Sequence, residues 1–184
     1  MKELNNFQDI KDFIKNFIIE DSELFKLIYF PNSFPNDNDF PDTPYEIFEP
    51  SEAHGCVLFR PKNDIVQSKE GTNVLIFFNS VNYNTILDDL YITFSVICKG
   101  VNVQELADST NRISTIANHI DNRFNMAVIN DISKIKRMSF KPLSLNEENS
   151  GMLITYHCRT LAYNPLDNVN YLQKHYGVDS REYL

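Results

Sequence analysis

The sequence lacks tryptophan, and its 184 residues include only five glycines and three cysteines. So few glycines exclude a collagen-like or low-complexity chain. Cys56, Cys98 and Cys158 are odd in number, lie far apart and stand among apolar residues. This pattern predicts reduced core thiols rather than a disulfide framework.

Long apolar segments are also missing. The longest apolar run, Val74 to Phe78, is far too short to cross a bilayer. The segment Met1 to Asp9 mixes charged and amide side chains and lacks the basic region and apolar stretch of a signal or transit peptide. We therefore expect a soluble protein that is made in a cytoplasm and has no membrane partner.

Acidic residues outnumber basic ones, and the formal net charge is −8. A groove that grips nucleic acid needs clustered Lys and Arg to contact phosphates, so the charge excludes that function class. A passage through which DNA slides stays open, since such a passage should avoid strong phosphate contacts. The length and the 42% hydrophobic content are sufficient for one core, and we expect a single domain over residues 1–184.

The N-terminal part predicts helices followed by an irregular arm. Apolar residues recur at helical spacing from Phe7 to Phe30, with a break near Glu20–Ser22 where Asp21 or Ser22 can cap a second helix. Prolines then define an arm at residues 31–53, because they remove backbone donors and favour turns. Its apolar side chains predict packing, either on the same chain or on a neighbouring subunit. They include Phe34, Phe40, Tyr45 and Phe48.

Strands, one helix and a hairpin follow the arm. We predict strands at residues 56–60, 74–78 and 90–99, with a turn-rich loop at 79–89 that contains Asp88 and Asp89. A long amphipathic helix is predicted from Leu106 to Phe124, and its polar face includes Asn111, Arg112, Asn118 and Asp121. Residues 132–145 and 152–162 predict a long antiparallel hairpin.

This order of elements predicts the α+β class. We expect a mixed, mainly antiparallel sheet with one long helix packed across it, N-terminal helices and a long β-hairpin. The chain ends in a polar and aromatic tail at residues 163–184.

Residues that could carry chemistry do not form a recognisable catalytic pattern. His119 and Asp121 stand two apart on a helix and point in different directions, which favours a solvated face. His157 and Cys158 are adjacent in a strand and therefore point to opposite faces. The cysteine and histidine spacing matches no zinc pattern, and the Asp88–Asp89 pair is a weak metal signal. We expect no catalytic, metal-binding or cofactor-binding residues, no cofactor and no enzymatic activity.

A small basic cluster stands on the first arm of the hairpin, in a chain that is acidic as a whole. Pairing with Asp or Glu across strands or between subunits explains this cluster better than DNA binding does. Its members are Lys134, Lys136, Arg137 and Lys141.

The order of elements from residue 74 to residue 163 resembles the tail terminator, or tail completion, proteins of long-tailed bacteriophages. The residues that carry this resemblance are Val74–Phe78, Leu87–Ile92, the helical Thr110–Asp121, Phe140–Leu143 and the return strand Met152–Arg159. The arm at 31–53 and the tail at 163–184 have no counterpart in the resemblance.

The resemblance implies a structural virion protein of the tail or neck, assembled in the host cytoplasm. It would form a hexameric ring that ends the tail tube and joins it to the head. The implied partners are further copies, the tail tube, a sheath protein and head-connector or neck proteins, while DNA passes without specific binding. Other neck, connector or baseplate components share this pattern, and a small cytoplasmic binding or regulatory module remains an alternative.

Rings close through contacts between two different patches of one chain, and an arm and a hairpin can supply such patches. For the lumen we expect Glu147 and Glu148 at the hairpin tip, whose charge would repel DNA. The expected intersubunit contacts are Phe34, Phe40, Tyr45, Phe48, Asp88, Asp89, Lys136 and Arg137.

Overall fold

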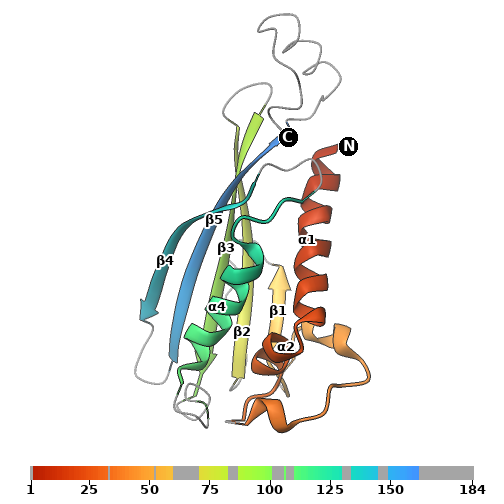
Figure 1. The fold of residues 1–184 in the computed structure, drawn as a ribbon, viewed down its shortest axis with the longest axis vertical. Helices are drawn as coiled ribbons and strands as arrows, with labels where there is room; N and C mark the ends of the chain where they lie inside the picture. Colours follow the sequence, from red (N-terminus) through yellow and green to blue (C-terminus); the bar gives the residue numbers. More distant parts are fainter. Residues whose placement is uncertain are drawn as a thin grey trace, which may run out of the picture.

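A five-stranded sheet forms one layer of the computed structural model, and helices pack against one face of it (Figure 1). The strand order is β1-β2-β3-β5-β4; β1 and β2 are parallel, and the other neighbouring pairs are antiparallel. The predicted α+β class is confirmed. The structure describes residues 2–32, 34–51, 53–59, 71–82, 87–100, 106, 110–129, 134–144 and 149–161.

Two helices begin the chain, as the apolar spacing predicts. Helix α1 spans Lys2–Glu20 and α2 spans Ser22–Tyr29. Asp21 separates them, because its side chain accepts a hydrogen bond from the Leu24 N–H at 3.0 Å and so begins a new helix. Among the described residues, no helix is long and apolar enough to cross a membrane.

Three strands, β2, β3 and β5, are longer than the sequence predicts, whereas β4 begins later than the predicted 132–145 segment. Their bounds are Cys56–Phe59 for β1, Gly71–Asn82 for β2, Leu87–Lys99 for β3, Lys136–Ser144 for β4 and Asn149–Leu161 for β5. The predicted loop at 79–89 is wrong at both ends, since residues 79–82 pair with 88–91. Asn and Asp are poor strand formers, but here the neighbouring strands supply the backbone partners. The antiparallel hairpin is confirmed by the pairing of β4 with β5.

Helix α4 spans Arg112–Phe124, which is six residues shorter at its start than predicted. The side chain of Asn111 caps it by accepting from the Ser114 N–H at 3.0 Å. With 13 residues, α4 is shorter than α1 with 19, so the single long helix of the prediction is not confirmed. It lies over β3 and β5.

The proline-rich arm follows a defined path along its own body. It contains two short 3₁₀ helices, Pro35–Asp37 and Pro44–Phe48, of which the second contacts β1. Ile47 is fully buried, and the Phe40 ring lies 4.4 Å from that of Phe25. Gly55 lets the chain return closely, because a Cβ atom there would lie 1.9 Å from the Ile28 carbonyl oxygen.

The main core lies between the helices and the inner face of the sheet. Alternate residues of β3 are buried in it, namely Leu90, Ile92, Phe94, Val96 and Cys98. An aromatic group at its centre joins α1, α4, β3 and β5 through the Phe124 ring, which lies 5.1 Å from Phe94 and 4.9 Å from Tyr156. This packing fixes α4 on the sheet.

Candidate functional site

Arg112 is fully buried, and its placement on a solvated helix face is wrong. Its Nη1 donates to the carbonyl oxygens of Leu27 at 3.0 Å and Phe30 at 2.5 Å, and its Nη2 donates to the carbonyl of Asn32. Burial lowers the pKa of Arg112. The guanidinium therefore pairs carbonyls at the end of α2 that have no partner within that helix. Among the described residues, the Arg112 Nε has no hydrogen-bond partner.

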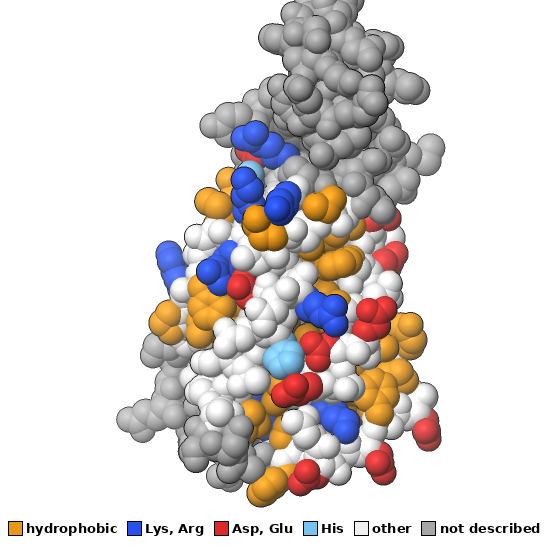
Figure 2. Space-filling model, viewed as in Figure 1, with side chains coloured by type: hydrophobic (Ala, Val, Ile, Leu, Met, Phe, Trp, Pro, Cys, Tyr) orange, Lys and Arg blue, Asp and Glu red, His pale blue; other side chains and the backbone are white. Residues whose placement is uncertain are grey.

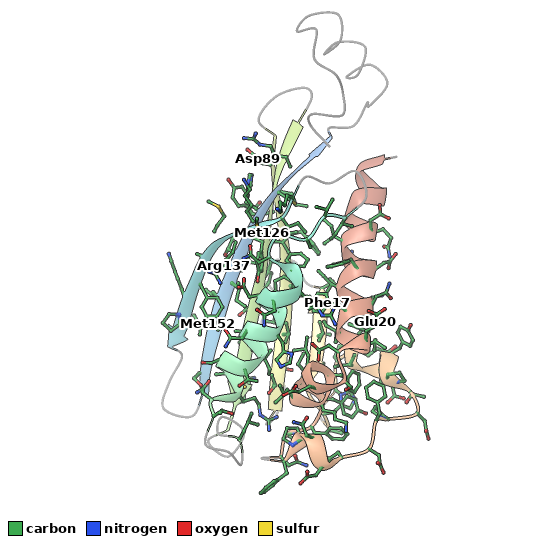
Figure 3. The ribbon with its side chains drawn as sticks, viewed as in Figure 1. Phe17, Glu20, Asp89, Met126, Arg137 and Met152 are labelled. Carbon is green, nitrogen blue, oxygen red and sulfur yellow. The ribbon has the colours of Figure 1, made fainter. Side chains whose placement is uncertain are left out.

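Asp121 is engaged with the sheet rather than with solvent. The Tyr156 hydroxyl donates to its Oδ1 at 3.0 Å, and Arg137 Nη1 donates to its Oδ2 at 2.5 Å. Burial and the Asp121 charge raise the pKa of Tyr156. Figure 3 shows Arg137 beside α4 on the β4 side. The predicted solvated face is wrong here, because this carboxylate fastens α4 to β4 and β5.

His119 also contacts another element. Its Nδ1 lies 3.0 Å from Oδ2 of Asp21, the residue that caps α2. Burial raises the pKa of Asp21, whereas the hydrogen bond from the Leu24 N–H and the contact with His119 lower it. The lowering causes together outweigh burial, so the pKa of Asp21 is below its ordinary value. The pair therefore joins α4 to the start of α2.

A third polar cluster lies near the beginning of β3. The Oδ1 of Asp89 lies 2.7 Å from His157 Nε2 and accepts from Arg159 Nε at 3.1 Å. The bond to His157 is the main cause that lowers the pKa of Asp89. Figure 3 shows Asp89 near this end of the sheet. Asp89 is thus a buried tie between β3 and β5.

The Asp89 cluster makes the stability of the protein depend on acid pH. Because the folded-state pKa of Asp89 is below its ordinary value of 3.8, the stabilisation is complete above that value and is lost as the pH falls through the lower folded-state pKa. Asp89→Asn should therefore lose less stability than the wild type between about pH 5 and pH 3. Urea unfolding followed by circular dichroism measures this, and equal acid slopes for the two proteins would contradict it.

Buried thiols are poor candidates for nucleophiles. Burial raises the pKa of Cys98 to about 11 and that of Cys158 to about 12. Both thiols are protonated at neutral pH, and only thiolates attack efficiently. Within the described ranges, no three His, Cys, Asp or Glu side chains come together in a way that could hold a metal ion.

Exposed apolar and acidic side chains gather on the arm. Phe34 is 59% exposed although the next residue, Pro35, is buried. Tyr45 is 64% exposed although Ile47, two residues further on, is buried. The described acidic residues of the segment are all exposed. We call this group the arm surface; it consists of Phe34, Asp37, Asp39, Phe40, Asp42, Tyr45, Glu46 and Glu49.

The opposite edge of the sheet carries exposed apolar and basic side chains. Met138 stands at an irregularity in the β4–β5 register and is 61% exposed. The Met126 N–H donates to the Ile135 carbonyl at 2.7 Å, which holds the segment after α4 beside the start of β4. Figure 3 shows Met126 just beyond the end of α4. We call this group the edge surface; it consists of Met126, Val128, Lys134, Lys136, Met138, Phe140 and Lys141.

A pocket of about 500 Å³ lies at the sheet. Its lining is largely apolar and includes Phe77, Tyr91 and Leu153. The side chains of Thr93 and Thr155 add two hydroxyl groups, whose oxygens lie 3.3 Å apart. This pocket could receive an apolar group with a hydrogen-bonding end.

The YomW family model matches residues 21–158. The chain belongs to the YomW family. The family is named after a gene of the Bacillus phage SPBc2, which marks this chain as phage-associated. No curated protein matches the chain.

In this YomW-family chain, the intersubunit contacts that the sequence predicts lie in different surroundings. Phe34, Phe40 and Tyr45 lie on the arm surface and Lys136 lies on the edge surface. Phe48, Asp89 and Arg137 contact other side chains of their own chain. Asp88 pairs through its backbone within β3, and its side chain lies outside the described part. Glu147, Glu148 and the tail at 163–184 also lie outside the described residues.

Several members of the two surfaces were missed by the sequence interpretation. The arm acids, Met126, Val128 and Met138 were given no contact role, and Phe140 was used only for the resemblance. A signal was available, because residues 34–51 contain five acidic and no basic side chains, whereas residues 134–144 contain four basic and no acidic ones. Counting charge by segment would have revealed the acidic and the basic members of the two surfaces, but not the exposed apolar ones.

Proposed function

We propose that this chain is a structural protein of a tailed-phage virion, located in the tail or neck and assembled in the host cytoplasm. It forms a ring, hexameric by resemblance, that ends the tail tube and joins it to the head or neck. Membership of a family named after a phage gene supports the phage setting. The α+β fold with α4 across the sheet and the β4–β5 hairpin supports the resemblance to tail terminators.

The carboxylate and imidazole side chains that could carry chemistry are bonded within the fold, which supports a structural rather than a catalytic role. Asp21, Asp89 and Asp121 are all bonded to other elements of the fold, as are His119 and His157. Each of these contacts joins two elements of the same chain. The proposal thus assigns these groups to holding the body rigid, as a ring component requires.

The proposed partners are further copies of the chain, the tail tube, a sheath protein and head-connector or neck proteins. DNA passes without specific binding, because a formal net charge of −8 repels phosphates. Glu147 and Glu148 remain the predicted lumen residues.

Phage particles assembled without this chain test the proposal. We expect heads that lack joined tails and tail tubes of uncontrolled length, because nothing would end the tube or dock it to the neck. Electron micrographs of lysates with and without the restored gene measure both features. Joined particles with tails of normal length in the absence of the chain would overturn the tail terminator role.

The pocket at the sheet favours a second candidate, a small binding module. Its lining of Phe77, Tyr91 and Leu153 with two threonine hydroxyls is of the kind that holds apolar ligands. The same micrographs separate the two functions, because a regulatory module would leave assembled particles normal in shape.

A further inference from the structure

We propose that the arm surface of one copy docks on the edge surface of the next copy, head to tail. This contact rests on the proposed ring and names the residues that would build it. The two surfaces lie at opposite edges of the sheet, since the arm contacts β1 and the edge surface is centred on β4. Figure 2 shows acidic and hydrophobic side chains gathered on one side of the molecule, and basic and hydrophobic side chains on the other.

Charge complementarity identifies a second copy as the occupant. The arm surface has five acidic side chains, Asp37, Asp39, Asp42, Glu46 and Glu49, and the edge surface has three lysines, Lys134, Lys136 and Lys141. All eight are exposed, and none of them forms an ion pair within the described residues. Opposite charges on facing surfaces steer association and fix its register.

Both surfaces also contain the residue types that form the centre of an interface. Exposed Phe34, Phe40 and Tyr45 lie in the same segment as the acids, and exposed Met138 and Phe140 lie between Lys136 and Lys141 along β4. Aromatic residues and Met are enriched at interface centres, with polar residues around them. Matched apolar centres with rims of opposite charge supply affinity and selectivity together.

The arm is held in place before docking. Buried Pro35 and Ile47 anchor it, and Asn38 Nδ2 donates to the Phe34 carbonyl at 3.0 Å. Lys26 Nζ donates to the Asn36 carbonyl at 3.2 Å. A segment that is already ordered loses little conformational entropy on binding, so the arm can dock in the conformation that it already has.

The edge strand is unsuited to pairing with another strand. Its register irregularity around Met138, its exposed lysines and Pro142 are features that discourage edge-to-edge pairing. An irregular acidic arm requires no such pairing, because it can contact the edge through side chains. These features favour the arm over a strand as the element that docks there.

Docking between two different patches has a geometric consequence. After the first contact one copy keeps a free edge surface and the other keeps a free arm surface, so further copies can be added at both ends. Such a contact builds a ring when the rotation between successive copies closes, whereas a contact between two identical patches would stop at a dimer. The proposed hexamer requires the first kind.

A charge-swap experiment tests the contact. The arm variant is Asp42→Lys/Glu46→Lys, and the edge variant is Lys136→Glu/Lys141→Glu; all four side chains are exposed, so the fold should persist. Each variant alone places like charges opposite each other, and we expect its association to weaken at least about tenfold. An equimolar mixture should regain assemblies in which the two variants alternate, because each interface again joins opposite charges.

The control variant Asp9→Lys/Asp12→Lys changes the net charge as the arm variant does, but on α1 and away from both surfaces. It should assemble like the wild type, and light scattering at several concentrations with circular dichroism of each protein measures the outcome. A wild type that forms rings while both variants assemble equally well overturns this contact and leaves the ring in place. A monomeric wild type overturns the contact. The proposed function is tested separately, by the electron micrographs of phage assembled without the chain.

Discussion

Replacing Phe124 with alanine is expected to lower the free energy of unfolding by about 3–5 kcal/mol. The side chain is fully buried, and its ring contacts those of Phe13, Phe17, Phe94 and Tyr156. Removal of the ring leaves a cavity where α1, α4 and the sheet meet. Rigid aromatic neighbours from three other elements, α1, β3 and β5, cannot all move to fill it.

The control for this change is Phe34→Ala, because Phe34 is 59% exposed. We expect its free energy of unfolding to stay within about 0.5 kcal/mol of the wild type. Urea unfolding followed by circular dichroism measures both variants. A Phe124→Ala protein that is as stable as Phe34→Ala would contradict the described core.

Arg112→Met is expected to destabilise the fold by about 3 kcal/mol, because one buried and two partly buried carbonyls lose their donor, and an unpaired buried acceptor costs about 1–3 kcal/mol. Replacing a buried charge with an apolar group can be neutral when its polar partners are replaced too. Here the partners are the backbone carbonyls of Leu27, Phe30 and Asn32, which a side-chain substitution leaves in place. The penalty for unpaired acceptors therefore dominates.

Two further variants isolate the role of the guanidinium. Arg112→Lys should be intermediate, because one ammonium group cannot donate across several carbonyls as the planar fork does. Arg123→Met removes an exposed arginine from the other end of α4 and should change the stability by at most about 0.5 kcal/mol. Thermal and urea unfolding compare the three, and equal stability of Arg112→Met and Arg123→Met would exclude the capping role.

Local signals in the sequence were sufficient for the N-terminal helices and the hairpin. The break between α1 and α2 follows from Asp21, whose side chain caps the next helix within three residues. The hairpin follows from two strand-like segments around a short polar loop. Each of these features depends on neighbours in sequence, which a single sequence contains.

Long-range contacts decided what the sequence could not predict. Arg112 stands on the polar face of the predicted helix, so solvent exposure was the natural expectation, yet its partner Leu27 is 85 residues away. The extension of β2 through Asn79 depends on its pairing with Tyr91 in β3. In both cases a distant segment supplies the hydrogen bonds that the local residue types do not favour.

The candidate surfaces could be predicted only in part. Phe34, Phe40 and Tyr45 were expected to contact a partner or the body, and the fold leaves them on the surface. The exposure of Met138 and Phe140 was not predictable, because it depends on the position of β4 at the end of the strand order. The alternation of apolar and polar residues along a strand distinguishes its two faces, but it does not show which strand lies at the edge of the sheet.

The mass of the wild-type protein in solution, measured by light scattering across a range of concentrations, tests the central claim most directly. That claim is that copies join through two different surfaces and close into a ring. We expect the mass to rise from that of the 21.4 kDa chain to one larger assembly, hexameric by resemblance, that then stops growing. A mass that stays at one chain, or that stops at a dimer, would contradict it.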